Sequence, residues 1–168
     1  MNADEQATLR RWTIVVGLVL GVTVSILFPL LVTKWDRHLV EVSLGPFRWV
    51  GLVPISLGVI LVVWSAALLF TRGGGTPAPW DPPQRFILAG PYQYVRNPMM
   101  LGVFATVFGE AVLAESLAIL LYLGLVVSVV CWYVVAIEEK GLEIRFTDTY
   151  VVYKERVPRW LPDLRRKR

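Results

Sequence analysis

The chain has 168 residues, of which 55% are hydrophobic and 18% are charged, and its net charge is +4. This balance leaves too little polar surface to cover a soluble globule, and the modest positive charge is better explained by contact with anionic lipid than by nucleic acid. The apolar residues form long blocks instead, as in an integral membrane protein.

Four segments are predicted to cross the membrane. Three of them carry no charge over 22 residues each, which is enough to span a hydrocarbon core. The fourth has 16 residues and contains Glu110, so as a helix it would cover roughly 24 Å. The four segments are 12–33, 49–70, 99–114 and 116–137. The last two form a predicted helical hairpin.

The resulting prediction is an all-α fold. We expect residues 1–168 to form one polytopic membrane helix bundle with four transmembrane helices and a cytoplasmic, amphipathic C-terminal segment. The first apolar segment is too long for a signal peptide, so we expect it to be retained as a helix.

Basic residues are distributed unevenly around these segments. The stretch 34–48 holds three of the 17 Lys and Arg residues, and the hairpin turn holds none. The others lie near the N-terminus, in 71–98 and in 138–168. The positive-inside rule therefore places these three regions and both termini in the cytoplasm. In a prokaryote, the membrane would be the inner membrane.

Cysteine and histidine limit the chemistry that is available. Cys131 is the only cysteine and lies inside a predicted span, which excludes an intrachain disulfide and a thiol metal cluster. His38 is the only histidine and lies in the predicted outer loop. A cytoplasmic site must therefore work without imidazole, which excludes a Ser-His-Asp triad and histidine-ligated zinc there. No metal site is predicted.

Two turn motifs precede the hairpin. They are Gly90-Pro91-Tyr92 and Arg96-Asn97-Pro98, and each contains a proline that resists continued helix. The glycine- and proline-rich stretch 73–83 comes before them. It fits either a stiff connection across the membrane face or a lid over a ligand. It is not a phosphate-binding loop, because no Gly-Lys-Ser/Thr follows.

Glu138 and Glu139 follow the last uncharged segment. Adjacent carboxylates at the C-terminal end of a helix repel each other and the negative end of the helix dipole, so we expect a positive partner from the protein or from a ligand. Pairing with Arg145 or with the arginines of the tail is the structural alternative. After the two acids, 142–156 is predicted to be amphipathic, with a break near Thr147.

The motifs in this order resemble the isoprenylcysteine carboxyl methyltransferase and phospholipid methyltransferase superfamily of integral membrane methyltransferases. The shared pattern is Gly-Pro-Tyr, three residues, Arg-His/Asn-Pro, a transmembrane hairpin, Glu-Glu and a tyrosine-containing tail. In this chain it covers residues 73–162. The chain departs from the isoprenylcysteine enzymes at Asn97 and Met100, where they typically have His and Tyr.

The resemblance implies that S-adenosyl-L-methionine is the cofactor. It would be bound between the hairpin and the tail, with 71–98 as a cofactor loop and 138–168 completing the site. The implied catalytic residues are Arg96, Asn97 and Glu139. The implied cofactor-binding residues are Gly90, Tyr92, Arg96, Asn97, Glu138 and Glu139. One of the two acids would hold the ammonium group of the cofactor.

The expected function is methyl transfer to a lipidic or amphiphilic acceptor that enters from the bilayer. The acceptor atom is either a carboxylate of an isoprenylcysteine-like molecule or the amine of a phospholipid. The reaction depends on alignment and exclusion of water, so the missing histidine is compatible with it. The alternatives are a four-helix transporter that uses Glu110 and a non-catalytic membrane scaffold. The spacing of Gly17 and Gly21 fits either a dimer or internal packing, so it predicts no oligomeric state.

Overall fold

The computed structural model describes residues 21–39, 43–75 and 83–162, together with isolated positions between 8 and 19. Much of the first predicted span before residue 21, the stretch 76–82 and the basic end 163–168 lie outside the described residues. The part described is helical and contains no strand, which confirms the predicted all-α class.

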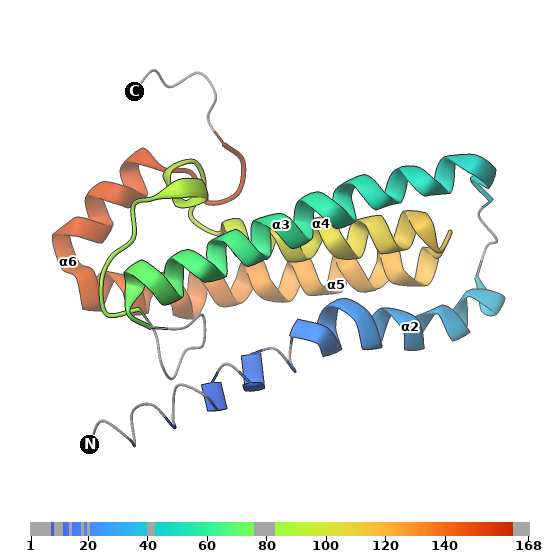
Figure 1. Cartoon of the computed structure of the whole chain (residues 1–168), viewed down its shortest axis with the longest axis horizontal. Helices are drawn as coiled ribbons and strands as arrows, with labels where there is room; N and C mark the ends of the chain where they lie inside the picture. Colours follow the sequence, from blue (N-terminus) through green and yellow to red (C-terminus); the bar gives the residue numbers. More distant parts are fainter. Residues whose placement is uncertain are drawn as a thin grey trace.

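The helices form an elongated bundle (Figure 1). The first described helix includes a π-helical turn at Thr23–Leu27, α2 at Phe28–Val32 and a 3-10 turn at Thr33–His38. The next runs without interruption from Gly45 to Gly73 and contains α3, Leu52–Leu68. A short 3-10 turn at Gly90–Gln93 leads to α4, Pro98–Leu113. The turn after α4 leads to α5, Leu117–Tyr133.

Within the described residues, two helices have the length and composition needed to cross a membrane. Gly45–Gly73 has 29 residues and a mean hydropathy of 2.4, and Leu117–Arg156 has 40 residues and a mean hydropathy of 2.5. Only 17% of each apolar window is buried inside the protein. The apolar side chains therefore face outward, as those of lipid-exposed helices do. The helix Pro98–Leu113 is apolar but shorter.

Glycine contacts hold α3 and α4 together. A Cβ atom on Gly58 would lie 2.5 Å from the carbonyl oxygen of Gly102, and one on Gly102 would lie 2.7 Å from the carbonyl oxygen of Gly58. Gly51 and Gly109 are related in the same way, at 2.5 and 2.4 Å. The spacing of seven residues on both helices keeps the two contacts on one face. The two backbones therefore approach each other closely at both points, and side chains such as Ile55, Val62 and Thr106 pack around the contact.

The turn between α4 and α5 confirms the predicted hairpin. Glu115 adopts a positive φ of 55°, and the hydroxyl of Ser116 accepts a hydrogen bond from the backbone N–H of Ile119 at 3.0 Å, which caps α5. Two carboxylates tie this turn to the rest of the chain. Asp36 accepts from the N–H of Ala118 at 2.9 Å, and Glu115 accepts from the N–H of Leu44 at 2.8 Å. We call this the turn end of the bundle.

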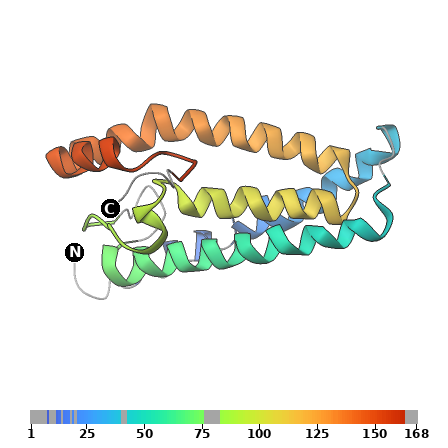
Figure 2. The ribbon, with the colours of Figure 1, turned by 90° about the horizontal axis from the view of Figure 1, so that it is seen from above.

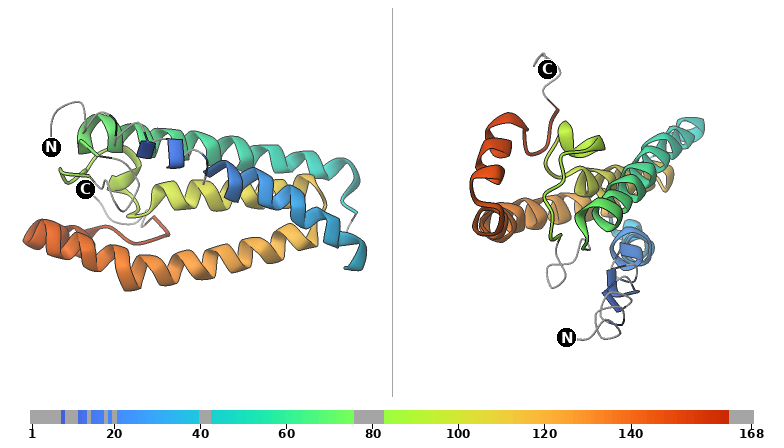
Figure 3. Two further views of the ribbon diagram at one scale, coloured as in Figure 1. Left: turned by 90° about the horizontal axis from the view of Figure 1, so that it is seen from below. Right: turned by 60° about the vertical axis from the view of Figure 1, so that its left-hand side comes forward.

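At the opposite end, α5 continues without a break into the C-terminal segment. A π-helical turn at Val134–Glu138 passes directly into α6, Glu139–Arg156. The prediction that the two acids stand at a helix C-terminus is therefore wrong, because the backbone hydrogen bonds continue past them. Toward this end of the bundle, which we call the site end, α5 leans away from the pair of α3 and α4 (Figures 2 and 3).

Helix α6 is bent at Thr147, where the predicted break is confirmed. The backbone of Thr147 has φ 41° and ψ −122°, and the second half of the helix turns back toward the bundle (Figure 1). Buried Tyr150, Tyr153 and Val157 pack there with Phe86, Leu142 and Phe146. This aromatic cluster fixes the second half of α6 against the segment 83–89, which leads to the first turn motif.

Candidate functional site

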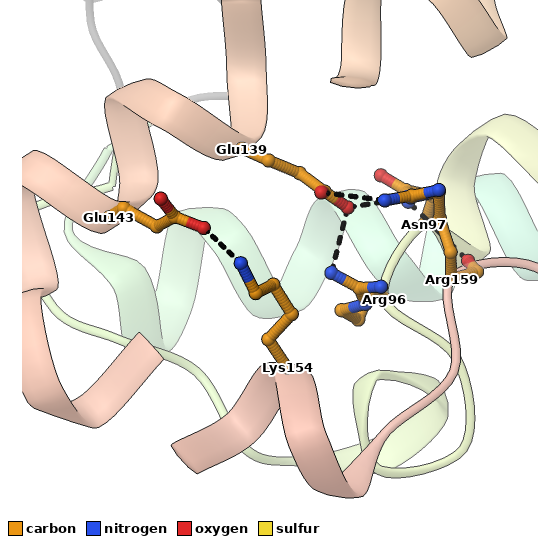
Figure 4. Close-up of polar contacts among 6 residues, drawn as sticks. All are labelled: Arg96, Asn97, Glu139, Glu143, Lys154 and Arg159. Carbon is orange, nitrogen blue, oxygen red and sulfur yellow. Dashed lines mark hydrogen bonds and ion pairs between the residues drawn. The ribbon is translucent and has the colours of Figure 1, made fainter. Parts of the chain in front are cut away.

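The site end of the bundle contains a cluster of buried charges (Figure 4). One oxygen of Glu139 accepts hydrogen bonds from Arg96 Nη1 and Arg159 Nε, both at 2.8 Å, and the other accepts from Arg159 Nη2 at 2.9 Å. The side chains of Arg96 and Glu139 are 10% and 9% exposed, whereas that of Arg159 is 33% exposed. Glu139 thus has the positive partners that the sequence predicted for the twin acids, and the tail supplies one of them.

Backbone hydrogen bonds place these side chains. Arg96 follows the 3-10 turn Gly90–Gln93, and its N–H donates to the carbonyl of Pro158 at 2.9 Å. The side-chain amide of Asn97 donates to the carbonyl of Arg159 at 3.4 Å. Asn97 precedes α4 but makes no capping hydrogen bond to that helix. Both residues of the second turn motif are therefore joined to the segment that follows α6.

Glu139 is held in its ionised form. Burial is the largest single effect and opposes ionisation, but the hydrogen bond from Arg159 and the positive charges of Arg96, Arg159 and Lys154 outweigh it. The net result is a pKa of Glu139 below its ordinary value. Because both of its oxygens already have guanidinium partners, this carboxylate serves to position the arginines.

Glu138 is in a different position. It makes no ion pair or hydrogen bond within the described part of the chain, although it is partly buried. Burial and, secondarily, the negative charge of Glu139 raise the pKa of Glu138. Removing a carboxylate from water without giving it a partner costs free energy, and a cation or a hydrogen-bond donor offsets this cost. Of the two acids, Glu138 is therefore the one that can bind a ligand.

Three tyrosines surround the two acids. Burial, followed by the charge of Glu138, raises the pKa of Tyr92, so that its phenol stays neutral beside this acid. The hydroxyl of Tyr153 donates to the carbonyl of Tyr92 at 2.7 Å. Tyr150 is 2% exposed, and burial, then the charge of Glu139, with Arg96 acting in the opposite direction, raises the pKa of Tyr150 to about 12. These phenols supply neutral donors and apolar ring surface next to the charges.

Gly90 has a structural reason to be glycine. Its φ is 56°, and a Cβ atom would lie 2.9 Å from Leu68 Cδ1 and 3.1 Å from Trp64 Cζ2. The residue thus allows the first turn motif to pack directly against the end of α3.

One donor of the charge cluster has no partner. Arg96 Nε is buried and makes no hydrogen bond among the described residues. Together, the Arg96 Nε–H and the Glu138 carboxylate present one donor with positive charge and one acceptor with negative charge. This combination is complementary to a ligand group that carries a carboxylate and an ammonium, as an α-amino acid does.

Other candidates from the sequence lie elsewhere. Glu110 is near the turn end of α4, about three helical turns from Asn97, and its Oε2 is buried without a partner among the described residues. Arg145 is exposed on α6 and makes no ion pair within that part of the chain, so it does not neutralise the twin acids. The described residues contain no group of three His, Cys, Asp or Glu side chains that could hold a metal ion.

Sequence patterns gave little indication of three further site residues. Tyr150 and Tyr153 occur in the tail pattern, but nothing in their spacing shows that they lie against Arg96 and Tyr92. Arg159 is one of several tail arginines that are equally suited to a membrane surface. The available signal is Val157-Pro158, which ends α6 and turns Arg159 back toward the bundle.

Comparisons with known proteins identify the family. The cobalt-zinc-cadmium resistance protein CzcN of Cupriavidus metallidurans is 26% identical over 153 residues, which are 91% of this chain. The chain spans 62% of the length of that curated relative. No solved structure matches the chain. The family described as phospholipid methyltransferase matches residues 46–149, from the start of the Gly45–Gly73 helix into the second half of α6. The chain therefore belongs to the phospholipid methyltransferase family.

Proposed function

We propose that the protein transfers a methyl group from S-adenosyl-L-methionine to a lipidic or amphiphilic acceptor at the cytoplasmic face of the membrane. Family membership indicates a methyltransferase that acts on a lipid. The observation that carries the proposal is the partly buried Glu138, which has no partner among the described residues and lies beside the Arg96–Glu139–Arg159 cluster.

The residues present fit the amino-acid end of this cofactor. Glu138 would accept from the ammonium group, and Arg96 Nε would donate to the carboxylate. Tyr92 and Tyr150 contribute ring faces to which a sulfonium is attracted. The cofactor supplies the methyl group, which an in-line displacement transfers to the acceptor.

The protein's own groups bind, orient and exclude water. Arg96, Glu139 and Tyr150 are all nearly inaccessible to solvent, so a ligand held among them is kept from hydrolysis and from random orientation. An acceptor carboxylate needs no base. An acceptor amine must lose a proton, and solvent would take it, because Glu138 would already hold the ammonium group of the cofactor.

The first test is binding of S-adenosylhomocysteine to the protein in nanodiscs, measured by calorimetry. Glu138→Gln should weaken binding at least roughly tenfold, since a charge-assisted hydrogen bond to the ammonium is lost. Glu143→Gln is the matched control, because it removes an acid from the same helix that pairs with Lys154 instead. Failure of the folded wild-type protein to bind in several lipid compositions would exclude the enzyme and favour a scaffold.

A second test identifies the acceptor. The protein is incubated with methyl-labelled S-adenosylmethionine and a total lipid extract, and the labelled lipid is treated with base. A methyl ester on a carboxylate releases labelled methanol, whereas an N-methyl group is stable. The base-labile product would assign a carboxyl methyltransferase, and the stable product would assign an aminolipid N-methyltransferase.

A transport function is the second candidate, because the Glu110 Oε2 is buried without a partner among the described residues, in a helix predicted to cross the membrane. The name of the relative CzcN, a cobalt-zinc-cadmium resistance protein, gives a direct assay. Under this candidate, Glu110→Gln abolishes metal tolerance or uptake while S-adenosylhomocysteine binding stays unchanged. The methyltransferase proposal expects the opposite pattern, with Glu138→Gln affecting binding and with no metal transport by either variant.

A further inference from the structure

The segment Val157–Trp160 returns the chain from the end of α6 to the start of α4, and we call it the strap. Val157 is 7% exposed and its N–H donates to the carbonyl of Tyr153 at 2.8 Å. Pro158 follows and allows no further helical hydrogen bond, so the chain leaves the helix axis here. The next two residues then reach the second turn motif and α4.

A small set of contacts holds the strap. Its backbone accepts two hydrogen bonds from the turn motif, from Arg96 N–H to Pro158 and from the Asn97 amide to Arg159. At its end, the ring of Trp160 lies 5.7 Å from that of Phe104 in α4. The strap is thus fixed by polar contacts to one turn, by the packing of Val157 in the aromatic cluster and by the contact of Trp160 with Phe104.

The strongest of these contacts is the ion pair of Arg159 with Glu139. Its two ends differ in solvent access, because the Arg159 side chain is 33% exposed and the Glu139 side chain is 9% exposed. Water can therefore reach the guanidinium and compete for it, while Glu139 keeps Arg96 as a partner. Releasing Arg159 leaves no buried charge without a counter-charge, so the pair can open at moderate cost.

The charge cluster beside Glu138 is covered, whereas Glu138 itself is partly exposed. Arg96, Glu139, Tyr150 and Tyr153 are each no more than 10% exposed. A ligand that reaches them from water must displace a chain segment. The strap contacts Arg96 and Glu139 directly. It can move as a unit with the second half of α6, which departs from helical geometry at Thr147, provided that the aromatic cluster parts from Phe86 at the same time.

We propose that the strap is a gate over the cofactor site and that Arg159 is the positioning residue that closes it. In the closed state, Arg159 occupies Glu139, fixes Arg96 and leaves Glu138 for the ligand. In the open state, the Arg159–Glu139 ion pair and the two backbone contacts are broken, and the ligand enters or leaves. This proposal rests on the proposed function for the identity of the ligand, but the movement of the strap is independent of it.

The ligand-dependent test is the dissociation rate of labelled S-adenosylhomocysteine from the protein in nanodiscs. Arg159→Gln should release it roughly tenfold faster, because the bidentate pair is lost. Arg159→Lys keeps the positive charge but loses the guanidinium group that binds both oxygens of Glu139, so it should give an intermediate dissociation rate. Arg145→Gln removes the same charge from the exposed face of α6 and should leave the rate unchanged. Equal rates in Arg159→Gln and wild type would overturn the gate.

A second test needs no ligand. In a Cys131→Ala background, Val157→Cys places a thiol at a position that the closed strap buries, and a water-soluble maleimide reports its exposure. Adding Arg159→Gln should raise the modification rate several-fold, and adding Arg145→Gln should not. An unchanged rate in the Arg159→Gln protein would overturn the gate even if the cofactor proposal holds.

A cross-link covers the case in which Val157→Cys does not fold. Phe104→Cys and Trp160→Cys, again without Cys131, can be joined by a short thiol-specific linker that reductant removes. Joining them should slow loading and release of S-adenosylhomocysteine, and reductant should restore both rates. Exchange at the same rate before and after reduction would contradict the gate. No binding to any folded protein would contradict the cofactor instead, while the maleimide experiment would still decide the strap.

Discussion

Arg159 binds both carboxylate oxygens of Glu139, and Arg96 binds one of them from a turn at the start of α4. The three residues come from the end of the chain, from the start of α6 and from the loop before the hairpin. The ion pairs join these segments at one buried point. In this arrangement Glu139 positions the arginines, and Glu138 remains available to a ligand. Substitution of the two acids should therefore change the stability of the protein in opposite directions.

Substitution of the two acids should change stability in opposite directions. Glu139→Gln leaves two arginines without their shared counter-charge and should lower the unfolding free energy by about 3 kcal/mol. Glu138→Gln removes a partly buried carboxylate without a partner and should raise stability at neutral pH, since a raised pKa means that ionisation of Glu138 opposes folding. Denaturant titration of both variants in the same detergent measures the difference. Destabilisation by Glu138→Gln would show that this acid has a structural partner.

The Glu139 cluster should also give the protein an acid-sensitive stability. The pKa of Glu139 is lower in the folded protein than its ordinary value of 4.5. Its contribution is therefore complete above the unfolded pKa and is lost as the pH falls through the lower folded pKa. The stability difference between wild type and Glu139→Gln should be constant near neutrality and shrink below that ordinary value. A difference that stays constant through the acid range would contradict the ion pairs.

The backbone contact of α3 with α4 should not tolerate a single methyl group at its centre. Gly58→Ala places a Cβ within 2.5 Å of both the Gly102 carbonyl and Thr106 Oγ1, so the helices must separate. The loss should be roughly 2 kcal/mol or more, as for other overpacked sites. Gly124→Ala in α5 is the control, because nothing lies within 4 Å of its Cβ position. Thermal unfolding of both variants in detergent tests the pair, and equal melting temperatures would contradict the contact.

The bend in α6 should be stabilised by glycine. Thr147 has a φ of 41°, which is costly for a β-branched residue and easy for glycine. Thr147→Gly should therefore raise stability by about 1 kcal/mol. Thr149→Gly, at a helical position two residues later, should lower it by a few tenths of a kcal/mol. If both substitutions destabilise, the bend is absent from the protein in lipid.

Several features of this structure follow from local sequence signals. The break at Thr147, the end of α6 at Val157-Pro158 and the hairpin turn at Glu115 each depend on a few adjacent residues whose backbone preferences are known. The need for positive partners around the twin acids also follows from their adjacency. These predictions hold because the relevant interactions act within one or two turns of the chain.

Other features depend on contacts between distant segments. The glycines with an evident packing spacing in the sequence, Gly17 and Gly21, have nothing within 4 Å of their Cβ positions, whereas the pairs that touch are split between α3 and α4. Charges at the end of an apolar segment mark the end of the bilayer but not the end of the helix, so the sequence did not show that α5 continues into α6. The choice of Arg159 among the tail arginines likewise needs the fold.

The direct backbone contact between α3 and α4 also divides the molecule mechanically. Two helices whose backbones approach this closely cannot shift easily relative to each other. Helices α3 and α4 therefore form a rigid pair. Helix α5 leans away from this pair toward the site end (Figure 2). The second half of α6 and the strap form a segment hinged at Thr147. Arg159 lies on this hinged segment, whereas Arg96 and Glu139 both lie outside it, so the ion pair of Arg159 with Glu139 is the contact that breaks when the segment moves.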